Sequence, residues 1–291
     1  VVKRVNGESI LLASFYASTS MNSEESVCLN TKDHRVRWRR RQIGEGEEGR
    51  GFGPWGITSV RQKSDGTSEL LFLAKDTVCH FDADTGNMLH EPWPLREATF
   101  QVMKSRKEQN VSTWGSEDDP FTAYGSIIIA DVDADGEDEF VIGGCMGGMG
   151  VFRSNHDILW WKRCVYNDLV LRLPGVADVD NDGIKEIGVG HADGKFVCYD
   201  GLDGSTKWTL NVGAVTTDIQ SCDIDGDGNV EFITGTSDGR LLAIVDGRIK
   251  WEYYFGYSVG NPIIADFDSD GFPEVIVAVG DGYLYSIVNA S

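Results

Sequence analysis

The chain has few basic residues and no long apolar run. Of its 291 residues, 26 are Lys or Arg and 46 are Asp or Glu, which gives a formal net charge of −20. Non-specific binding of nucleic acid needs a basic surface, so we expect no nucleic-acid partner. No stretch of about 18 apolar residues occurs, so we expect no membrane-spanning helix. The first residues, VVKRVNG, do not resemble a signal peptide.

Cysteine and histidine are also scarce, with six and five residues. Four cysteines occupy positions that hold small residues in other copies of an internal repeat, so we interpret them as buried fillers: Cys28, Cys79, Cys198 and Cys222. Cys145 and Cys164 lie outside that pattern, and the sequence leaves open whether they pair. The chain has no Ser/His/Asp signature, no Gly-rich phosphate loop and no Cys/His zinc spacing.

One acidic pattern, in contrast, occurs four times. The nine residues D-x-D-x-D-G-x-x-E recur over 131–139, 178–186, 223–231 and 266–274, with starts 47, 45 and 43 residues apart. Alternating carboxylates around a Gly bend form a cage of hard oxygens, which Ca²⁺ prefers. An EF-hand carries its last acid at position 12 on a helix, whereas here it stands at position 9 and enters a strand-like apolar run. We therefore predict four Ca²⁺ sites in strand–loop–strand units.

The predicted ligands of each ion are three Asp side chains, the carbonyl oxygen of position 7 and the Glu of position 9. They are Asp131, Asp133, Asp135, Glu137 and Glu139; Asp178, Asp180, Asp182, Ile184 and Glu186; Asp223, Asp225, Asp227, Asn229 and Glu231; and Asp266, Asp268, Asp270, Phe272 and Glu274. Four bound Ca²⁺ would bring the net charge to about −12, so the acidity is largely a signature of these loops. Extracellular modules often bind Ca²⁺ weakly, which favours an extracellular or periplasmic setting.

Short apolar segments bounded by Gly and Asp surround every acidic loop. Each unit contains four of them, and the last carries a Trp at a matched position: Trp38, Trp160, Trp208 and Trp251. Four strands per 40–45 residues, repeated, predict an all-β fold, a β-propeller of six or seven four-stranded blades. Because the Trp position repeats, we expect these rings to pack between blades rather than to stack on sugars.

We expect one β-propeller domain over 1–291. Residues 1–95 continue the strand pattern without acidic loops, 96–122 are an insertion or a degenerate blade, and 123–291 hold the four Ca²⁺-binding blades. The last unit ends after its third strand, and neither terminus supplies a fourth. We therefore expect the chain to be a segment of a longer protein with further domains.

The loops and their flanking strands resemble the FG-GAP/VCBS repeat family, the Ca²⁺-binding propeller blades of integrin α-subunits, some fungal lectins and several polysaccharide lyases. The resemblance covers 120–291 through the motifs and 1–95 through the strand pattern only. The third and fourth strands also look like quinoprotein-type blades with a docking Trp, which implies no quinone cofactor. The family implies the metal ligands given above but no single function, because this fold hosts many.

We expect a ligand on the blade ends opposite the acidic loops. Four residues expected there could serve β-elimination from a uronate sugar: His191, Arg172, Tyr166 and Tyr257. The Arg would neutralise the carboxylate, and His or Tyr would remove the proton. The alternative is that they are ordinary loop side chains. Our main prediction is an extracellular recognition module for carbohydrate or a protein partner; a polysaccharide lyase and a structural scaffold are the alternatives.

Arginines form the one basic cluster of the sequence, Arg35, Arg37, Arg39, Arg40 and Arg41. On an outermost strand, strict alternation would place all of these except Arg40 on one face. Such a row either protects a sheet edge by its charge or docks an acidic polysaccharide or a partner domain.

Overall fold

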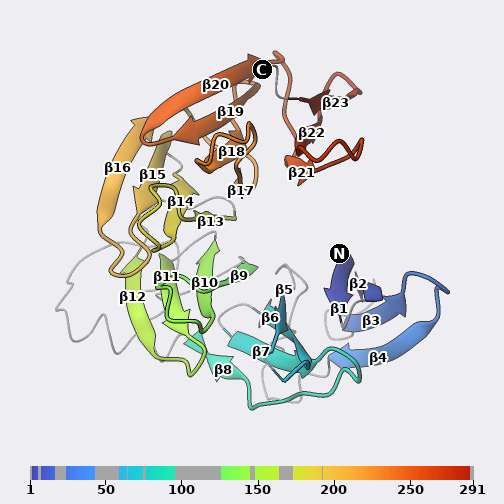
Figure 1. Ribbon diagram of the computed structural model, residues 1–291. Helices are drawn as coiled ribbons and strands as arrows, with labels where there is room; N and C mark the ends of the chain where they lie inside the picture. Colours follow the sequence, from blue (N-terminus) through green and yellow to red (C-terminus); the bar gives the residue numbers. More distant parts are fainter. Residues whose placement is uncertain are drawn as a thin grey trace. The chain divides into compact units, whose positions relative to one another are not determined.

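The computed structural model describes residues 2–5, 8–16, 24–42, 59–63, 65–74, 77–95, 126–144, 148–163, 173–191 and 193–288. The elements named within these ranges are all β-strands, arranged in six sheets (Figure 1). Among the described strands, five sheets have four strands and the sixth has three, and within each sheet successive strands pair antiparallel. The described residues divide into two compact units, and the boundary lies between Ile129 and Ala130.

The first unit holds two complete sheets, with orders β1-β2-β3-β4 and β5-β6-β7-β8. Their strands are β1 (Val2–Val5), β2 (Glu8–Tyr16), β3 (Glu24–Asn30), β4 (Val36–Gln42), β5 (Ser59–Gln62), β6 (Ser68–Ala74), β7 (Thr77–Asp82) and β8 (Trp93–Pro94). The strand pattern predicted for this part of the sequence is confirmed.

Four further sheets follow, one around each acidic loop. Their strands are β9 (Ser126–Ala130), β10 (Glu139–Gly144), β11 (Gly148–Arg153), β12 (Ile158–Arg163), β13 (Gly175–Ala177), β14 (Glu186–Gly190), β15 (Lys195–Tyr199), β16 (Thr206–Asn211), β17 (Gln220–Cys222), β18 (Glu231–Gly235), β19 (Arg240–Val245), β20 (Arg248–Tyr254), β21 (Ile263–Ala265), β22 (Glu274–Ala278) and β23 (Leu284–Ile287). The last sheet stops at its third strand, as the sequence predicted.

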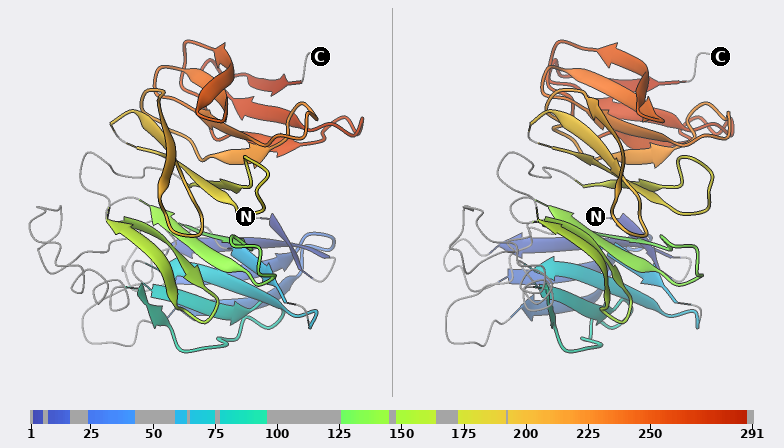
Figure 2. Two further views of the ribbon diagram at one scale, coloured as in Figure 1. Left: turned by 60° about the vertical axis from the view of Figure 1, so that its left-hand side comes forward. Right: turned by 90° about the vertical axis from the view of Figure 1, so that its left-hand side faces the viewer.

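Within the second unit the sheets stack face to face. The first strands β13, β17 and β21 lie next to one another, and each sheet extends outward from there to its last described strand, β16, β20 or β23 (Figures 1 and 2). The second strands are covered on both faces, so β14 (EIGVG) is buried throughout, whereas the outer β16 (TKWTLN) is mostly accessible. The acidic loops join first and second strands and therefore share one end of the sheets.

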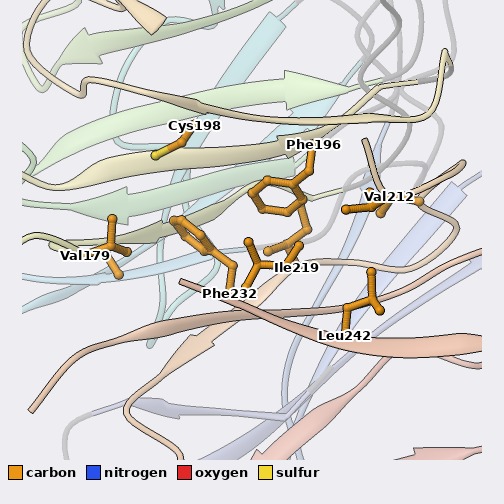
Figure 3. Packing of buried hydrophobic residues seen from close by; sticks show 10 residues of the cluster. Val179, Phe196, Cys198, Val212, Ile219, Phe232 and Leu242 are labelled. Carbon is orange, nitrogen blue, oxygen red and sulfur yellow. The ribbon is translucent and has the colours of Figure 1, made fainter. Parts of the chain in front are cut away.

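Aromatic rings fill the space between two successive sheets (Figure 3). The rings of Phe196 and Phe232 lie 5.5 Å apart, and Trp208 stacks on Phe196 at 5.8 Å. Gly188 faces both Phe rings so closely that a Cβ atom there would stand 2.8 Å from Phe196. The two sheets can pack this closely because residue 188 is a glycine and has no side chain.

The repeated tryptophans dock one sheet onto the next, as predicted. Trp38 Nε1 donates a hydrogen bond to the carbonyl oxygen of Ala83 at 3.0 Å, and Trp160 Nε1 donates to that of Gly201 at 2.7 Å. Each acceptor lies in the turn between the third and fourth strands of the following sheet. Gly204 in one such turn has φ of +72°, and a Cβ there would stand 2.6 Å from the Trp160 ring. These turns therefore need glycine.

The predicted one-faced arginine row is wrong. Strand β4 carries a bulge, because Cys28 pairs with Trp38 and Leu29 pairs with Val36, so Arg37 is the extra residue of the bulge. The bulge turns Arg37 toward Asp84, and the guanidinium Nη2 lies 3.0 Å from Oδ1. Strict alternation along the strand is thereby broken.

Four cysteines were predicted to be buried packing residues, and the prediction is confirmed for three of them. Cys28, Cys79 and Cys198 are buried and free, and burial raises the pKa of the Cys28 and Cys79 thiols to about 11. Cys222 is free but only partly buried. The pair Cys145 and Cys164 lies outside the described residues, as does the segment 96–122.

Candidate functional site

All four acidic loops share one set of hydrogen bonds. In the loop 178–186, the N–H of Gly183 donates to Asp178 Oδ2 at 3.0 Å, and the N–H of Val179 donates to Glu186 Oε2 at 2.9 Å. The same two bonds recur in the other loops, from Gly136 to Asp131, Val132 to Glu139, Gly228 to Asp223, Ile224 to Glu231, Gly271 to Asp266 and Phe267 to Glu274. The first and last carboxylates are thus fixed by backbone donors.

Two residues of each loop adopt the left-handed conformation. Position 6 is always glycine, with φ between +88° and +95°. Position 4 has φ of +58° at Ala134, +60° at Asn181, +71° at Gly226 and +65° at Ser269. Three of the four loops therefore hold a non-glycine residue in a conformation that costs about 1 kcal/mol. The two left-handed residues, at positions 4 and 6, bend the backbone so that the alternating carboxylates lie on one side of the loop.

The carboxylates of each loop converge. In the last loop one oxygen each from Asp266, Asp268, Asp270 and Glu274 lies within 4.8 Å of all the others. In the other loops three carboxylates converge equally closely: Asp131, Asp133 and Glu139; Asp178, Asp180 and Glu186; Asp223, Asp225 and Glu231. Every closing Glu is buried, being at most 3% exposed. Four acidic clusters could therefore bind metal ions.

Two buried oxygens indicate that such a cation fits. Asp131 Oδ1 and Asp133 Oδ1 are inaccessible to solvent, and no hydrogen-bond donor among the described residues contacts them. A buried carboxylate oxygen without a donor is costly, and a cation would remove that cost. All side-chain donors are carboxylate oxygens, which suit a hard divalent ion. Whether the carbonyl oxygens of position 7 take part stays a prediction.

Three clusters also contain a basic side chain, which the sequence analysis missed. Lys207 Nζ lies 2.6 Å from Asp180 and 2.8 Å from Glu186. In the loop 223–231, Lys250 Nζ lies 2.6 Å from Asp225 and 2.9 Å from Glu231. In the loop 131–139, the guanidinium of Arg153 lies 2.7 Å from Asp133 and 2.9 Å from Asp135. Burial alone would lower the pKa of Lys207, but its bonds to Asp180 and Glu186 raise the pKa well above its usual value.

A β-bulge aims each lysine at its cluster. Cys198 pairs with Trp208 and Tyr199 pairs with Thr206, so Lys207 is an extra residue on β16. Lys250 is the extra residue of β20 in the same way. A bulge re-aims a side chain, so the lysine reaches the loop of its own sheet while the next residue, Trp, faces the neighbouring sheet. In the sequence, the only sign of these lysines is that each one directly precedes a repeated tryptophan, as in Lys207-Trp208 and Lys250-Trp251.

Burial raises the pKa of the closing glutamates, an effect shared by Glu139, Glu186 and Glu231. In Glu186 and Glu231 the hydrogen bond from the lysine opposes this shift. The charged form of each Glu therefore depends on a nearby cation. Either the lysine or a metal ion can supply that positive charge.

Two of the four predicted catalytic residues, His191 and Tyr257, lie within the described residues. His191 is buried, and its Nε2 lies 3.3 Å from the hydroxyl of Tyr199. Tyr257 is exposed in the linker after β20. Tyr166 and Arg172 lie outside the described residues. Their part in catalysis stays a prediction.

Around Tyr257 the structure gathers an aromatic group that the sequence analysis did not single out. Tyr253 stacks on Phe255 at 5.9 Å, and Phe255 contacts Tyr285 at 4.9 Å. The Tyr285 hydroxyl donates to Asp281 Oδ2 at 2.6 Å, which raises the pKa of Tyr285, and Tyr283 and Tyr257 are close enough to add to this shift. The group lies at the far end of β20 from Lys250. It therefore stands opposite the acidic loops.

Comparison with solved structures identifies the architecture. BBS1N, solved in complex with ARL6DN, matches with a TM-score of 0.59 and 11% sequence identity, covering 96% of this chain and 77% of BBS1N. Sqt1 from Saccharomyces cerevisiae matches with a TM-score of 0.58 and 14% identity, covering 97% of this chain and 69% of Sqt1. Both are β-propeller proteins. The chain has the β-propeller fold. Its four-stranded sheets are the blades.

The propeller fold does not by itself assign a function. No protein-family model matches the chain, and no curated protein sequence does. As many as 654 chains of solved structures match, so the architecture is widespread and hosts many functions. None of the described elements is a helix with the length and apolar character needed to cross a membrane. The function has to be argued from the side chains.

Proposed function

We propose that this chain is an extracellular recognition module, a calcium-stabilised propeller of the FG-GAP/VCBS type that binds carbohydrate at the blade ends opposite its acidic loops. The four convergent carboxylate clusters support the calcium part. Four carboxylates, with the carbonyl oxygen of position 7, supply several hard oxygens around one point, and carboxylates can bind Ca²⁺ through both oxygens. Mg²⁺ is smaller and gives up its water reluctantly, so it fits such a cage less well.

Calcium would stabilise the blades rather than take part in chemistry. Each loop joins the first two strands of a blade, so an ion there holds two strands together at their common end. An ion that binds only the folded state adds about 2.7 kcal/mol per site at a hundredfold excess over its Kd. Extracellular calcium is abundant enough to fill weak sites, whereas cytosolic calcium is not.

Calorimetric titration of the chelator-treated protein tests the calcium part. We expect binding of four Ca²⁺ per chain and a melting temperature that rises by several degrees on adding Ca²⁺. Mg²⁺ at the same concentration should produce a much smaller rise. An unchanged melting temperature between chelator and millimolar Ca²⁺ would refute the role of calcium.

The exposed tyrosines support the carbohydrate part. Tyr253, Tyr257 and Tyr283 are 53%, 56% and 69% exposed, although large aromatic rings usually become buried. Their ring faces offer apolar contact to the C–H groups of a sugar. Their hydroxyls, and the carboxylate of Asp281 beside them, offer the hydrogen bonds that sugar hydroxyls need. This combination of apolar faces and small polar groups fits a glycan.

A glycan array with the calcium-loaded protein tests this assignment. We expect binding that Tyr257→Ala and Tyr283→Ala each weaken by about tenfold, corresponding to about 1.4 kcal/mol. Leu202→Ala is the matched control, because it removes an exposed apolar side chain from the turn between β15 and β16, at the acidic end instead. Equal binding by both tyrosine variants would move the site elsewhere. A protein ligand captured by these tyrosines, with no glycan signal, would overturn the carbohydrate assignment.

A further inference from the structure

Two neighbouring acidic loops are joined directly to each other by Lys185, which stands at position 8 of the loop 178–186. Its backbone N–H donates to the carbonyl oxygen of Val132, in the loop 131–139, at 2.9 Å. Its ammonium group donates to the carbonyl oxygen of Asp131, also at 2.9 Å. Lys185 therefore holds the first two residues of the acidic loop on the preceding blade.

This bridge connects the closing glutamates of the two loops. The N–H of Val132 donates to Glu139 Oε2 at 2.9 Å, so the residue that Lys185 holds also orients the closing Glu of the loop 131–139. On its other side Lys185 is adjacent in sequence to Glu186, the closing Glu of its own loop. The ammonium group donates to a main-chain carbonyl and not to a carboxylate, so it takes up none of the converging carboxylate oxygens.

The turn after β15 packs against both partners of the bridge. A Cβ atom on Gly201 would overlap the carbonyl oxygen of Lys185 and the side chain of Val132. The carbonyl oxygen of Gly201 accepts the hydrogen bond from Trp160, on the outer strand of the preceding blade. A shift of one loop against the other would have to displace this turn and the ring docked on it. We therefore expect the two loops to move together.

The later loops have a different residue at position 8. The loop 223–231 carries Val230, whose N–H donates no bond to the loop 178–186 within the described residues, and the loop 266–274 carries Pro273, which has no N–H. Neither side chain is cationic. The chain thus contains one pair of neighbouring loops joined through position 8 and two pairs without this bridge.

Buried oxygens make the loop 131–139 sensitive to how well it is held. The Asp133 side chain is 6% exposed, and its Oδ1, like that of Asp131, has no donor among the described residues. A cation would remove the cost of burying these oxygens. An ion that also has to order its loop binds more weakly than one that finds the loop already ordered. Lys185 supplies part of that order from the neighbouring loop.

We propose that Ca²⁺ binding at the loops 131–139 and 178–186 is positively cooperative, and that Lys185 transmits the coupling. The proposal rests on the calcium role argued above. Binding at 178–186 fixes Glu186 and the adjacent Lys185, so the loop 131–139 is already ordered when its own ion binds. Because linkage is reciprocal, each ion raises the affinity of the other by the same factor, about tenfold.

Calorimetric Ca²⁺ titration of two matched variants tests the coupling. Asp180→Ala removes the site at 178–186, and Asp225→Ala removes the site at 223–231 in the same way, because each Asp holds position 3 and pairs with a lysine on a strand bulge. We expect Asp225→Ala to bind three Ca²⁺ with the wild-type affinity. Asp180→Ala should bind two with that affinity and a third about tenfold more weakly. The melting temperature in chelator is the control for folding.

Two substitutions at residue 185 test the bridge itself. Lys185→Pro copies position 8 of the last loop and removes both hydrogen bonds, whereas Lys185→Met removes only the one from the ammonium group. In the Lys185→Pro background, Asp180→Ala should no longer weaken any of the three remaining sites. In the Lys185→Met background, the weakening should be smaller than tenfold.

The outcomes separate the coupling from the calcium role. Equal effects of Asp180→Ala and Asp225→Ala would overturn the cooperativity and leave the calcium role intact. Coupling that survives Lys185→Pro, or that Lys185→Met leaves undiminished, would overturn the part assigned to Lys185. A wild-type protein that binds no Ca²⁺ would overturn the calcium role and this proposal with it.

Discussion

The variant Lys207→Met separates the two cations that the acidic cluster 178–186 can use. In the structure the Lys207 ammonium lies between Asp180 and Glu186, and Glu186 is fully buried. Methionine keeps the length and most of the volume of the side chain but removes its charge. Without metal, the variant leaves a buried carboxylate with no positive partner. With calcium bound, the ion would supply that charge instead.

The expected loss of stability follows from the burial of Glu186. Removing one partner of a buried ion pair costs about 3–5 kcal/mol, and the lower value suits a lysine that retains some contact with water. For a domain of this size, about 3 kcal/mol corresponds to a fall in Tm of about 6–12 °C. In saturating Ca²⁺ the fall should shrink to about 2 °C or less. Ca²⁺ should also bind this site about tenfold more tightly, because a competing positive charge is gone.

Differential scanning calorimetry in chelator and in Ca²⁺ measures both quantities. Lys195→Met is the matched control, because Lys195 is a half-exposed lysine of the same blade that pairs with Asp193, outside the cluster. It should change Tm by a degree or two in either buffer. If Lys207→Met lowers Tm equally with and without Ca²⁺, then the lysine and the metal do not share the site, and the reasoning is wrong.

Three further outcomes are expected. Burial is the largest single effect and raises the pKa of Glu69, but hydrogen bonds and positive charge from His80 and Lys63 together outweigh it and hold the pKa below its usual value. Glu69 therefore stabilises the fold above about pH 4.3 and loses that effect as the pH falls. Glu69→Gln should therefore flatten the acid limb of the stability curve measured by urea unfolding. Ala134→Gly should raise the free energy of unfolding, measured with urea, by up to about 1 kcal/mol because it relieves a left-handed residue. Gly204→Ala should cost at least about 2 kcal/mol in thermal unfolding because its Cβ meets the Trp160 ring, and a neutral result would contradict the docking geometry.

The acidic loops were predictable because their chemistry is local. Three alternating carboxylates, a glycine at position 6 and a glutamate at position 9 all lie within nine residues, so spacing alone fixes which side chains converge. The same holds for the strands, whose ends are marked by Gly and Asp. The blade architecture follows from repeating this local pattern.

The basic partners were not predicted because they depend on pairing between distant strands. Lys207 stands 21 residues beyond Glu186, and only the bulge in β16 turns it toward the cluster. The same kind of bulge broke the alternation expected around Arg37. A bulge adds one residue without leaving a clear mark in hydrophobic periodicity, so simple alternation fails there. The aromatic group around Tyr285 was missed for a related reason, because its members come from β20, its linker and β23.

The lysines on the bulges of β16 and β20, Lys207 and Lys250, also affect when each blade can form relative to metal binding. An ammonium group that stands among the carboxylates keeps like charges from repelling one another while the blade forms. If the proposed calcium sites are filled during maturation, assembly of those blades does not have to wait for the ion, because the lysine already supplies a positive charge. The last blade has no such lysine among its described residues. Its carboxylates repel one another until a cation binds, so we expect the last blade to form later than its neighbours.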